Sequence, residues 1–235
     1  MLDVRVLGDR LELVGPAGTD LADRVLVDAP EIGLGFVEAR LLDPREVGPG
    51  PFDPMVAVVR VCPTSAVDVV SGFDQIDEQR VAARNLARLF MSAEILGACE
   101  HIMASAVTYA HDRTQFGQPI GAFQAVQHLL AAAEVQIRAL GSSLEMIVPR
   151  ISQLYDPATS YHLALLKALA GRTGQRVSQA TLQVFGGIGF TEEHEHHRYA
   201  KRLLTLDALC GSKDQLTKEI GQAARLGRLP LVAVP

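Results

Sequence analysis

The sequence of 235 residues predicts a mainly α-helical fold, an antiparallel helix bundle preceded by a small antiparallel β region. Residues 1–75 hold seven of the twelve prolines, contain no lysine and carry a net charge of −7. Residues 76–235 carry a net charge of +2. From Ile76 to Ala110 there is no proline and one glycine, and apolar residues recur at helical spacing. We therefore expect two parts, a β region over residues 1–75 and a helical domain over residues 76–235.

Four or five short strands are expected in the first part, which is too few to bury a large core. The segments around Gly8-Asp9 alternate polar and apolar residues, and this pair is typical of a hairpin turn. Leu42–Pro54 contains four prolines and is predicted to be a loop. The expected strands, rich in Val and Leu, are Asp3–Leu7, Arg10–Val14, Arg24–Val27 and Met55–Val61.

Three long helices and two shorter ones are expected in the second part. Pro149 should end the second helix, and Gly186-Gly187 should end the third. Packed together they form a bundle that holds most of the core. The expected ranges are Ile76–Ala110, Phe123–Leu144, Ala158–Phe185, Glu193–Leu204 and Lys213–Leu226. Inward-facing positions should include Leu86, Leu89, Phe90, Leu96, Met103, Val107, Ile137, Leu140, Leu165, Leu169 and Val184.

The composition excludes several classes of protein. A net charge of −5 and a pI near 5.8 argue against nucleic-acid binding. A membrane span needs about 18 or more uncharged apolar residues in a row, and the sequence contains no such run. The first residues also lack the basic and then apolar pattern of a signal peptide. The cysteines, Cys62, Cys99 and Cys210, are far apart, which suits a reducing cytoplasm. Cys62 and Cys99 are expected to be small buried hydrophobic residues.

The most informative stretch runs from Tyr109 to His128, between the first two long helices. It presents a guanidinium at Arg113, amides that include Gln115, and an aromatic ring at Phe116. These groups suit a phosphate and a planar ring. Taken alone, the same residues also fit an ordinary helix–helix connection with a surface arginine.

Together with a second stretch, Gln183–Thr191, this segment resembles the signatures of the acyl-CoA dehydrogenase family. Both signatures belong to the C-terminal helical domain of that family and occur here in the same order. The resemblance covers roughly residues 76–225 closely. It extends weakly back to Leu26–Pro30, which is similar to strands of the family's middle β-domain.

The resemblance implies a flavoprotein. Family members oxidise an acyl-CoA thioester to the 2,3-enoyl-CoA, a carboxylate removing the α-proton while FAD accepts the β-hydride. The family positions that match these signatures contact FAD bound by a neighbouring subunit, which implies an oligomer. An arginine fork suits phosphate oxygens, and glycine permits close approach of the backbone. The cofactor-binding residues expected on this basis are Arg113, Gln115, Phe116, Gln183, Gly186 and Gly187.

The sequence departs from the family at the catalytic base. Cys210 stands at the usual glutamate position, and a thiol with a pKa of about 8.5 is mostly protonated at neutral pH. Ala87, just before Arg88, stands at the position that some members use instead. Asp207 and Glu94 are the remaining carboxylates that could act as a displaced base.

The flavin-covering side also differs from the family. Nothing in residues 1–75 matches the segment that covers the flavin ring, and the family's N-terminal helical domain has no counterpart in this sequence. Asp214 stands where a flavin-contacting glutamine usually lies, and its charge would repel FAD phosphates. We therefore expect the chain to retain the residues that contact FAD bound by a neighbouring subunit. We expect it to lack the residues that would hold an FAD of its own.

These expectations favour a non-catalytic subunit of a heteromeric acyl-CoA dehydrogenase, arranged as α2β2, that shares FAD across an interface. The partner would be a full-length subunit that carries the glutamate and holds most of the acyl-CoA. A steroid side-chain CoA thioester is the expected substrate. Two alternatives remain: a homomeric dehydrogenase with a displaced base, and a scaffold that binds no flavin. The His194–His197 run lacks metal-ligand spacing, and no metal is expected.

Overall fold

A computed structural model describes residues 3–7, 10–16, 24–29, 33–38, 48–49, 56–61, 68–69 and 76–228. The contacts divide the chain into two compact units, Met1–Arg84 and Asn85–Pro235. This division lies within the first long helix, α1, which spans Ile76–Asp112.

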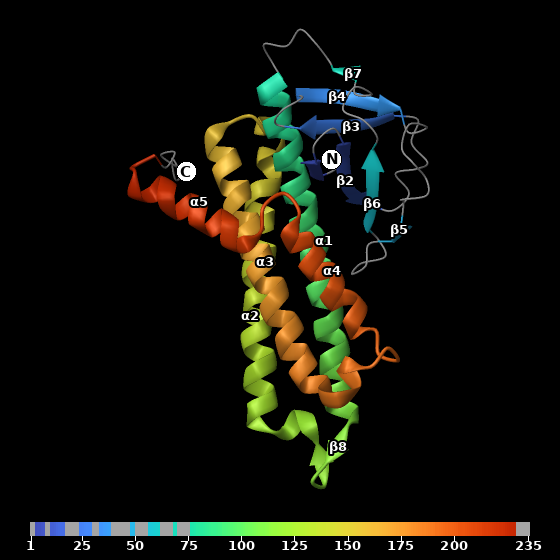
Figure 1. Cartoon of the computed structure of the whole chain (residues 1–235). Helices are drawn as coiled ribbons and strands as arrows, with labels where there is room; N and C mark the ends of the chain where they lie inside the picture. The colour runs from blue at the N-terminus through green and yellow to red at the C-terminus, as the bar shows by residue number, and fades with distance from the viewer. Residues whose placement is uncertain are drawn as a thin grey trace. The chain divides into compact units, whose positions relative to one another are not determined.

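The first unit contains two antiparallel sheets, whose strands are labelled in Figure 1. One sheet has the order β1-β2-β6-β5 and the other the order β3-β4-β7. In the first sheet, Leu7 pairs with Arg10, so the two leading strands form the expected hairpin. Its turn residues, Gly8 and Asp9, lie outside the described residues. The strands are β1 (Asp3–Leu7), β2 (Arg10–Pro16), β3 (Arg24–Ala29), β4 (Gly33–Glu38), β5 (Gly48–Pro49), β6 (Val56–Val61) and β7 (Asp68–Val69).

The sequence predicted four of these strands and missed β4, β5 and β7. The expectation of a loop throughout Leu42–Pro54 was wrong at β5, where Gly48 and Pro49 pair with Val58 and Ala57. A proline is tolerated there because β5 lies at the edge of its sheet. In β4, the glycines at 33 and 35 weaken the alternation from which strands are recognised.

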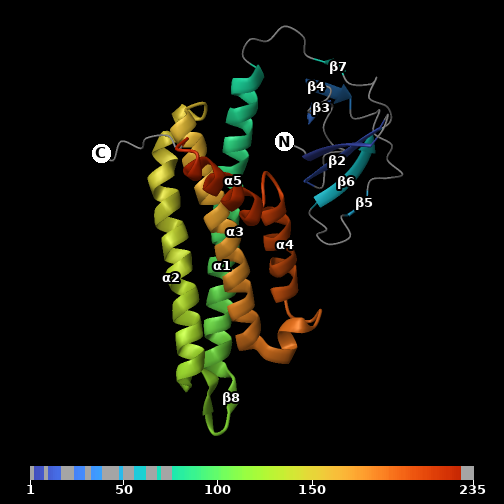
Figure 2. The same ribbon diagram turned by 60° about the vertical axis from the view of Figure 1, so that its left-hand side comes forward.

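The second unit is an antiparallel helix bundle, as predicted. Three long helices lie side by side in both views, α4 runs along them, and α5 crosses them at an angle (Figures 1 and 2). Short 3-10 turns lie in the connections between the helices, at Ile120–Ala122, Val148–Gln153 and Gly186–Phe190. The helices are α1 (Ile76–Asp112), α2 (Gln124–Ile147), α3 (Pro157–Phe185), α4 (His196–Ala208) and α5 (Lys213–Arg225).

Local chemistry explains where α3 and α5 begin and where α3 ends. Asp156 caps α3, its Oδ2 accepting a hydrogen bond of 2.8 Å from the Thr159 N–H, and Pro157 takes the first helical position. Gly186 ends this helix with a φ of +62°, which glycine adopts readily. Ser212 caps α5 by accepting a hydrogen bond of 3.3 Å from the Gln215 N–H.

The core lies between α1, α2, α3 and α4. The Cys99 side chain is fully buried, as expected, and burial raises the pKa of its thiol to about 12. Cys62 lies outside the described residues. Fully or nearly fully buried members of the core include Ile95, Cys99, Ile102, Ile137, Leu140, Leu163, Leu166, Val177 and Leu206.

Three residues expected to face inward are exposed: Phe90, Val107 and Leu165. Phe90 is 61% exposed, whereas the neighbouring Leu89 is 5% exposed. The buried face of α1 also contains Asn85 and Ser92, so counting only apolar residues misplaced it by about one position.

Candidate functional site

The two sequence signatures meet at one end of the bundle. The connection after α1 and the turn after α3 together line an open hollow of about 460 Å³. Figures 1 and 2 show this end at the bottom, where the hairpin that contains β8 projects from α1. The residues that line the hollow are Tyr109, Arg113, Gln115, Ile120, Val184, Phe185, Gly187 and Ile188.

A small hairpin positions Arg113 and Gln115. It consists of β8 (Thr114–Gln115) and β9 (Gln118–Pro119), and the Ile120 N–H closes it by donating a 2.8 Å bond to the Arg113 carbonyl. Its two turn residues, Phe116 and Gly117, have φ values of +53° and +79°. Positive φ at both positions suits the right-handed twist of a two-residue hairpin, although it is uncommon for phenylalanine. The turn leaves the Phe116 ring 93% exposed.

The glycine-rich turn after α3 forms the facing side of the hollow. A Cβ atom added to Gly186 or Gly187 would meet nothing within 4 Å, so the backbone there is open to a ligand. Gly189, in contrast, is required for packing, because a Cβ would lie 2.8 Å from Leu182 Cδ1 and 3.0 Å from Phe185 Cβ. The backbone of this turn is therefore accessible at Gly186 and Gly187 and tightly packed at Gly189.

A small apolar cluster holds both sides of the hollow in place. Ala106 and Ala110 of α1 pack against Val184 and Phe185 of α3, with Tyr109 and Ile120 at the edge. The Tyr109 and Phe185 rings meet edge to face with centroids 5.4 Å apart. The two signatures are thus supported by contacts between the ends of α1 and α3.

The charges of the hollow suit an anionic ligand. Arg113 is exposed, and within the described residues no carboxylate forms an ion pair with it. The adjacent Asp112 pairs instead with His111, at 3.2 Å. An unpaired guanidinium beside an open glycine backbone fits a phosphate group, and Tyr109 and Phe185 supply aromatic rings to the lining. The residues present therefore fit the phosphate-bearing part of a flavin nucleotide.

The structure brings together some of the six expected cofactor-binding residues. Arg113, Gln115 and Gly187 line the hollow. Gln183, Gly186 and Phe116 are not among its lining residues. Gln183 is exposed on α3, Gly186 begins the turn, and Phe116 projects from the tip of the hairpin.

One of the two positions considered for a catalytic glutamate, Cys210, is contacted by the residue that follows the other. Arg88, which follows Ala87 on α1, donates from Nε to the Cys210 carbonyl at 3.0 Å. Cys210 is half-buried in the connection between α4 and α5. It has a φ of +55°, and the next residue, Gly211, has a φ of +102°. This connection is therefore a tight turn held against α1.

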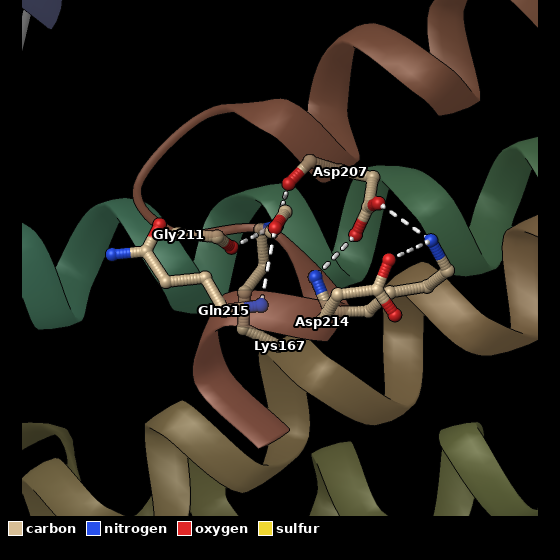
Figure 3. Close-up of polar contacts among 7 residues, drawn as sticks. Lys167, Asp207, Gly211, Asp214 and Gln215 are labelled. Atoms are coloured by element: carbon tan, nitrogen blue, oxygen red, sulfur yellow. Dashed lines mark hydrogen bonds and ion pairs between the residues drawn. The ribbon is translucent and has the colours of Figure 1, made fainter. Parts of the chain in front are cut away.

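A buried lysine fastens the same connection to α3. Lys167 has no exposed surface, and its Nζ donates to the carbonyls of Asp207 at 3.0 Å and Gly211 at 3.2 Å (Figure 3). Burial lowers the pKa of Lys167 to about 8, and the nearby Asp207 charge opposes this shift. Sequence patterns gave no sign of this lysine, which was expected neither in the core nor at a site.

Both candidates for a displaced base are engaged in other contacts. Glu94 forms a two-point ion pair with Arg202 of α4, with N–O distances of 2.6 and 3.1 Å. Asp207 Oδ1 accepts a 2.9 Å bond from the Lys213 N–H, and its Oδ2 lies 3.5 Å from Lys213 Nζ (Figure 3). These contacts assign both carboxylates to the packing of α4 against its neighbours.

The histidine run at residues 194–197 is part of the packing. The His196 Nε2 lies 3.1 Å from both Thr181 Oγ1 and the Ser178 carbonyl, and burial lowers its pKa. Among the described residues, no three His, Cys, Asp or Glu side chains are placed to hold a metal ion. In the same part of the chain, none of the helices is both long and apolar enough to cross a membrane.

Sequence reasoning missed several residues of the hollow. Tyr109 and Ile120 lie within the first signature stretch, and Ile188 lies within the second, so their positions in the motifs could have identified them. Val184 and Phe185 also lie within the second signature, but Val184 was expected only to face inward and Phe185 only to be the last residue of the third helix. They take part because the helix ends beside the hollow.

Residues 78–224 match the family described as "Acyl-CoA dehydrogenase, C-terminal domain". FadE27, an acyl-CoA dehydrogenase of Mycobacterium tuberculosis, is 29% identical over 252 residues, covering 91% of this chain and 67% of that protein. IpdE2 of Mycolicibacterium smegmatis is 34% identical over 126 residues, covering 54% of this chain and 38% of that protein. The match to FadE34 of Mycobacterium tuberculosis covers 21% of that protein, so the chain spans less than two thirds of several relatives.

Solved structures share the fold. The ChsE4-ChsE5 complex from Mycobacterium tuberculosis gives a TM-score of 0.72 at 24% identity, covering 97% of this chain and 63% of that chain. A variant of the Tcur3481-Tcur3483 steroid ACAD gives a TM-score of 0.73, also at 24% identity, with 96% and 63% covered.

Proposed function

The chain belongs to the acyl-CoA dehydrogenase family, and from this premise we propose that it is a subunit of a heteromeric, FAD-dependent acyl-CoA dehydrogenase. In this proposal it lends part of a flavin site to a partner and does not supply the catalytic base. The partner is a full-length acyl-CoA dehydrogenase subunit, the complex is an α2β2 heterotetramer, and it acts in the cytoplasm.

The observation that carries the proposal is the hollow where the two signatures meet. Arg113 offers parallel N–H donors to phosphate oxygens, and Gly187 allows a ligand to approach the backbone. Phe116 offers an exposed ring to a planar group. When bound, FAD supplies the acceptor for the hydride removed in α,β-dehydrogenation. The residues of this chain would hold the nucleotide part of FAD bound mainly by the partner.

The absence of a base at the family positions supports a non-catalytic role. Residue 210 is cysteine and residue 87 is alanine, so neither offers a carboxylate. Glu94 and Asp207 already accept hydrogen bonds within the bundle. A homomeric enzyme with a displaced base would need one of these carboxylates to leave its present partner.

The names of two structural neighbours support a proposal for the substrate class. ChsE4-ChsE5 is described as a complex, and Tcur3481-Tcur3483 as a steroid ACAD. We propose that the complex containing this chain acts on a steroid side-chain CoA thioester, which is held mainly by the partner. Residues 1–75 correspond in this proposal to part of the family's middle β-domain, consistent with their antiparallel strands.

The test is the flavin content of the chain made alone and made together with its partner. The chain alone should be colourless, and the complex should be yellow and active. Arg113→Ala should weaken flavin binding by the complex about 10- to 100-fold, the equivalent of a charge-assisted hydrogen bond of about 1.5–3 kcal/mol. Arg138→Ala is the matched control, because Arg138 is an exposed arginine of α2 that pairs with Glu134.

Two outcomes would contradict the proposal. Stoichiometric flavin and turnover from this chain alone, abolished by Glu94→Gln or by Asp207→Asn, would establish the homomeric enzyme with a displaced base. Normal flavin content in a complex whose copy of this chain carries Arg113→Ala would favour the alternative in which this chain is a scaffold that binds no flavin.

A further inference from the structure

A second hollow, independent of the Arg113 hollow, lies between α3 and α5. It measures about 500 Å³ and is open to solvent on one side of the bundle. Four of its seven lining residues are cationic and one is acidic. We call it the α3–α5 cleft, and its lining residues are Arg172, Gln175, Arg176, Lys213, Asp214, Thr217 and Lys218.

The α3–α5 cleft carries an excess of unpaired positive charge. Lys213 Nζ is balanced by Asp214 at 3.3 Å and Asp207 at 3.5 Å. Within the described residues, no carboxylate forms an ion pair with the other three cations, Arg172, Arg176 and Lys218. Cations gathered in one concave site without counter-charges raise the local concentration of anions.

The cations converge from two elements that are packed closely together. Arg172 and Arg176 lie one turn apart on α3, so they share a side of the helix. Arg176 Nη1 donates to Gln136 Oε1 of α2 at 3.4 Å, which orients its guanidinium. Lys218 lies on α5, whose first turns also line the cleft, and the positive end of a helix dipole favours an anion there.

The lining also limits what the ligand can be. It contains no aromatic and no large apolar side chain, so it offers no apolar surface to an acyl chain. A protein partner would be expected to meet an apolar centre, which this cleft lacks. Guanidinium forks, an ammonium, the Thr217 hydroxyl and the Gln175 amide all suit phosphate oxygens. We propose that the α3–α5 cleft binds a phosphate or diphosphate group, either as a free ion or as part of coenzyme A.

The experiment is a calorimetric titration of the full chain with inorganic pyrophosphate, and separately with coenzyme A, in 150 mM chloride. The double variant Arg172→Gln/Arg176→Gln should weaken binding of pyrophosphate at least 10-fold, since it removes both forks. Arg138→Gln/Arg225→Gln removes the same charge from residues outside the cleft and should leave the affinity unchanged. Arg113→Ala should also leave it unchanged, which separates this site from the proposed flavin site.

The two sources of phosphate are distinguished by competition. Coenzyme A that displaces pyrophosphate, with a loss of its own binding in the cleft variant, would identify the phosphates of coenzyme A as the source. Pyrophosphate binding without such competition would identify a free diphosphate. The proposal is overturned by an absence of saturable binding, by an equal loss in the matched control, or by a loss in Arg113→Ala.

Discussion

Lys167 illustrates at the scale of a single residue how a buried charge can be held by main-chain carbonyls. Its two hydrogen bonds reach Asp207 and Gly211, in the connection where the family usually places a catalytic glutamate. Removing an ammonium from water is costly even when it is hydrogen-bonded, and burial accordingly lowers its pKa to about 8. Burial thus disfavours the charged form of Lys167, while its two hydrogen bonds hold the α4–α5 connection to α3.

This cost predicts a specific pH dependence of stability. An unfolded lysine has a pKa of 10.5, so between pH 8 and 10.5 the unfolded chain retains a proton that folded Lys167 has released. The free energy of unfolding should therefore rise with pH across this window, by roughly 3 kcal/mol at about 1.4 kcal/mol per pKa unit. Urea unfolding of the native chain and of Lys167→Met at several pH values measures it.

The difference in the free energy of unfolding between the native chain and Lys167→Met isolates the titration of Lys167, because the two chains share every other titrating group. The native chain should gain stability relative to Lys167→Met as the pH rises from 8 to 10.5, and the difference should stay constant below pH 8. Parallel curves throughout would show that the lysine titrates normally in the folded chain.

The site residues differ in how far the sequence could predict them. Arg113, Gln115 and Gly187 belong to two contiguous motifs, so their meeting in one hollow could be expected. Lys167 could not be predicted, because its partners Asp207 and Gly211 are distant in the sequence and accept through their backbones. A main-chain carbonyl leaves no signature in the side-chain pattern.

At the scale of elements, the close approach of α3 to the α4–α5 junction depends on Gly171. A Cβ added there would collide with Asp207 Oδ1 and would lie 3.1 Å from Lys213 Cβ. The glycine thus makes room for the carboxylate that accepts from the Lys213 N–H at the start of α5. A side chain at residue 171 would push this carboxylate away from its donor.

We therefore expect Gly171→Ala to destabilise the chain by about 1–3 kcal/mol, through overpacking and loss of the Asp207 hydrogen bond. Gly97→Ala is the control, because Gly97 lies in α1 and an added Cβ would meet nothing within 4 Å. The control should be neutral or stabilising by about 0.5–1 kcal/mol, the ordinary gain from alanine in a helix. Thermal unfolding followed by circular dichroism compares the two. Equal effects would show that the Gly171 contact is not important.

Elements were predictable in proportion to their length and regularity. The three long helices have many turns of apolar periodicity, and their ends carry local signals such as Pro157 and Gly186. Strands β5 and β7 have two residues each, which is too short for any alternation to be recognised. The buried face of α1 was misplaced because two polar residues lie in the interior with satisfied hydrogen bonds. Asn85 donates to the distant Leu154 carbonyl and Ser160 hydroxyl, and Ser92 donates to the Arg88 carbonyl one turn earlier.

At the scale of the molecule, the larger of the two apolar clusters described in the helical unit is shared by four helices. Ile95 has no exposed surface and lies where α1 meets α3, its Cγ2 3.4 Å from the position a Gly174 Cβ would take. Because the neighbouring helices are tied together by other contacts, the space left by a truncated side chain should not collapse completely.

Ile95→Ala should therefore lower the free energy of unfolding by about 2–5 kcal/mol, measured by urea denaturation of the full chain. Val135→Ala is the matched control, since Val135 is 63% exposed on α2 and should change stability by less than about 0.5 kcal/mol. A loss of less than about 1 kcal/mol in Ile95→Ala would mean that the core readily repacks around this position.

The contact between Gly171 and Asp207 also restricts how this sequence can change during evolution. A larger residue at position 171 is compatible only with a residue at position 207 that leaves the space beside α3 empty. The first of the two substitutions would be selected against unless the second accompanied it. Among descendants of this chain, the two positions should therefore vary together or not at all, although they lie on separate helices.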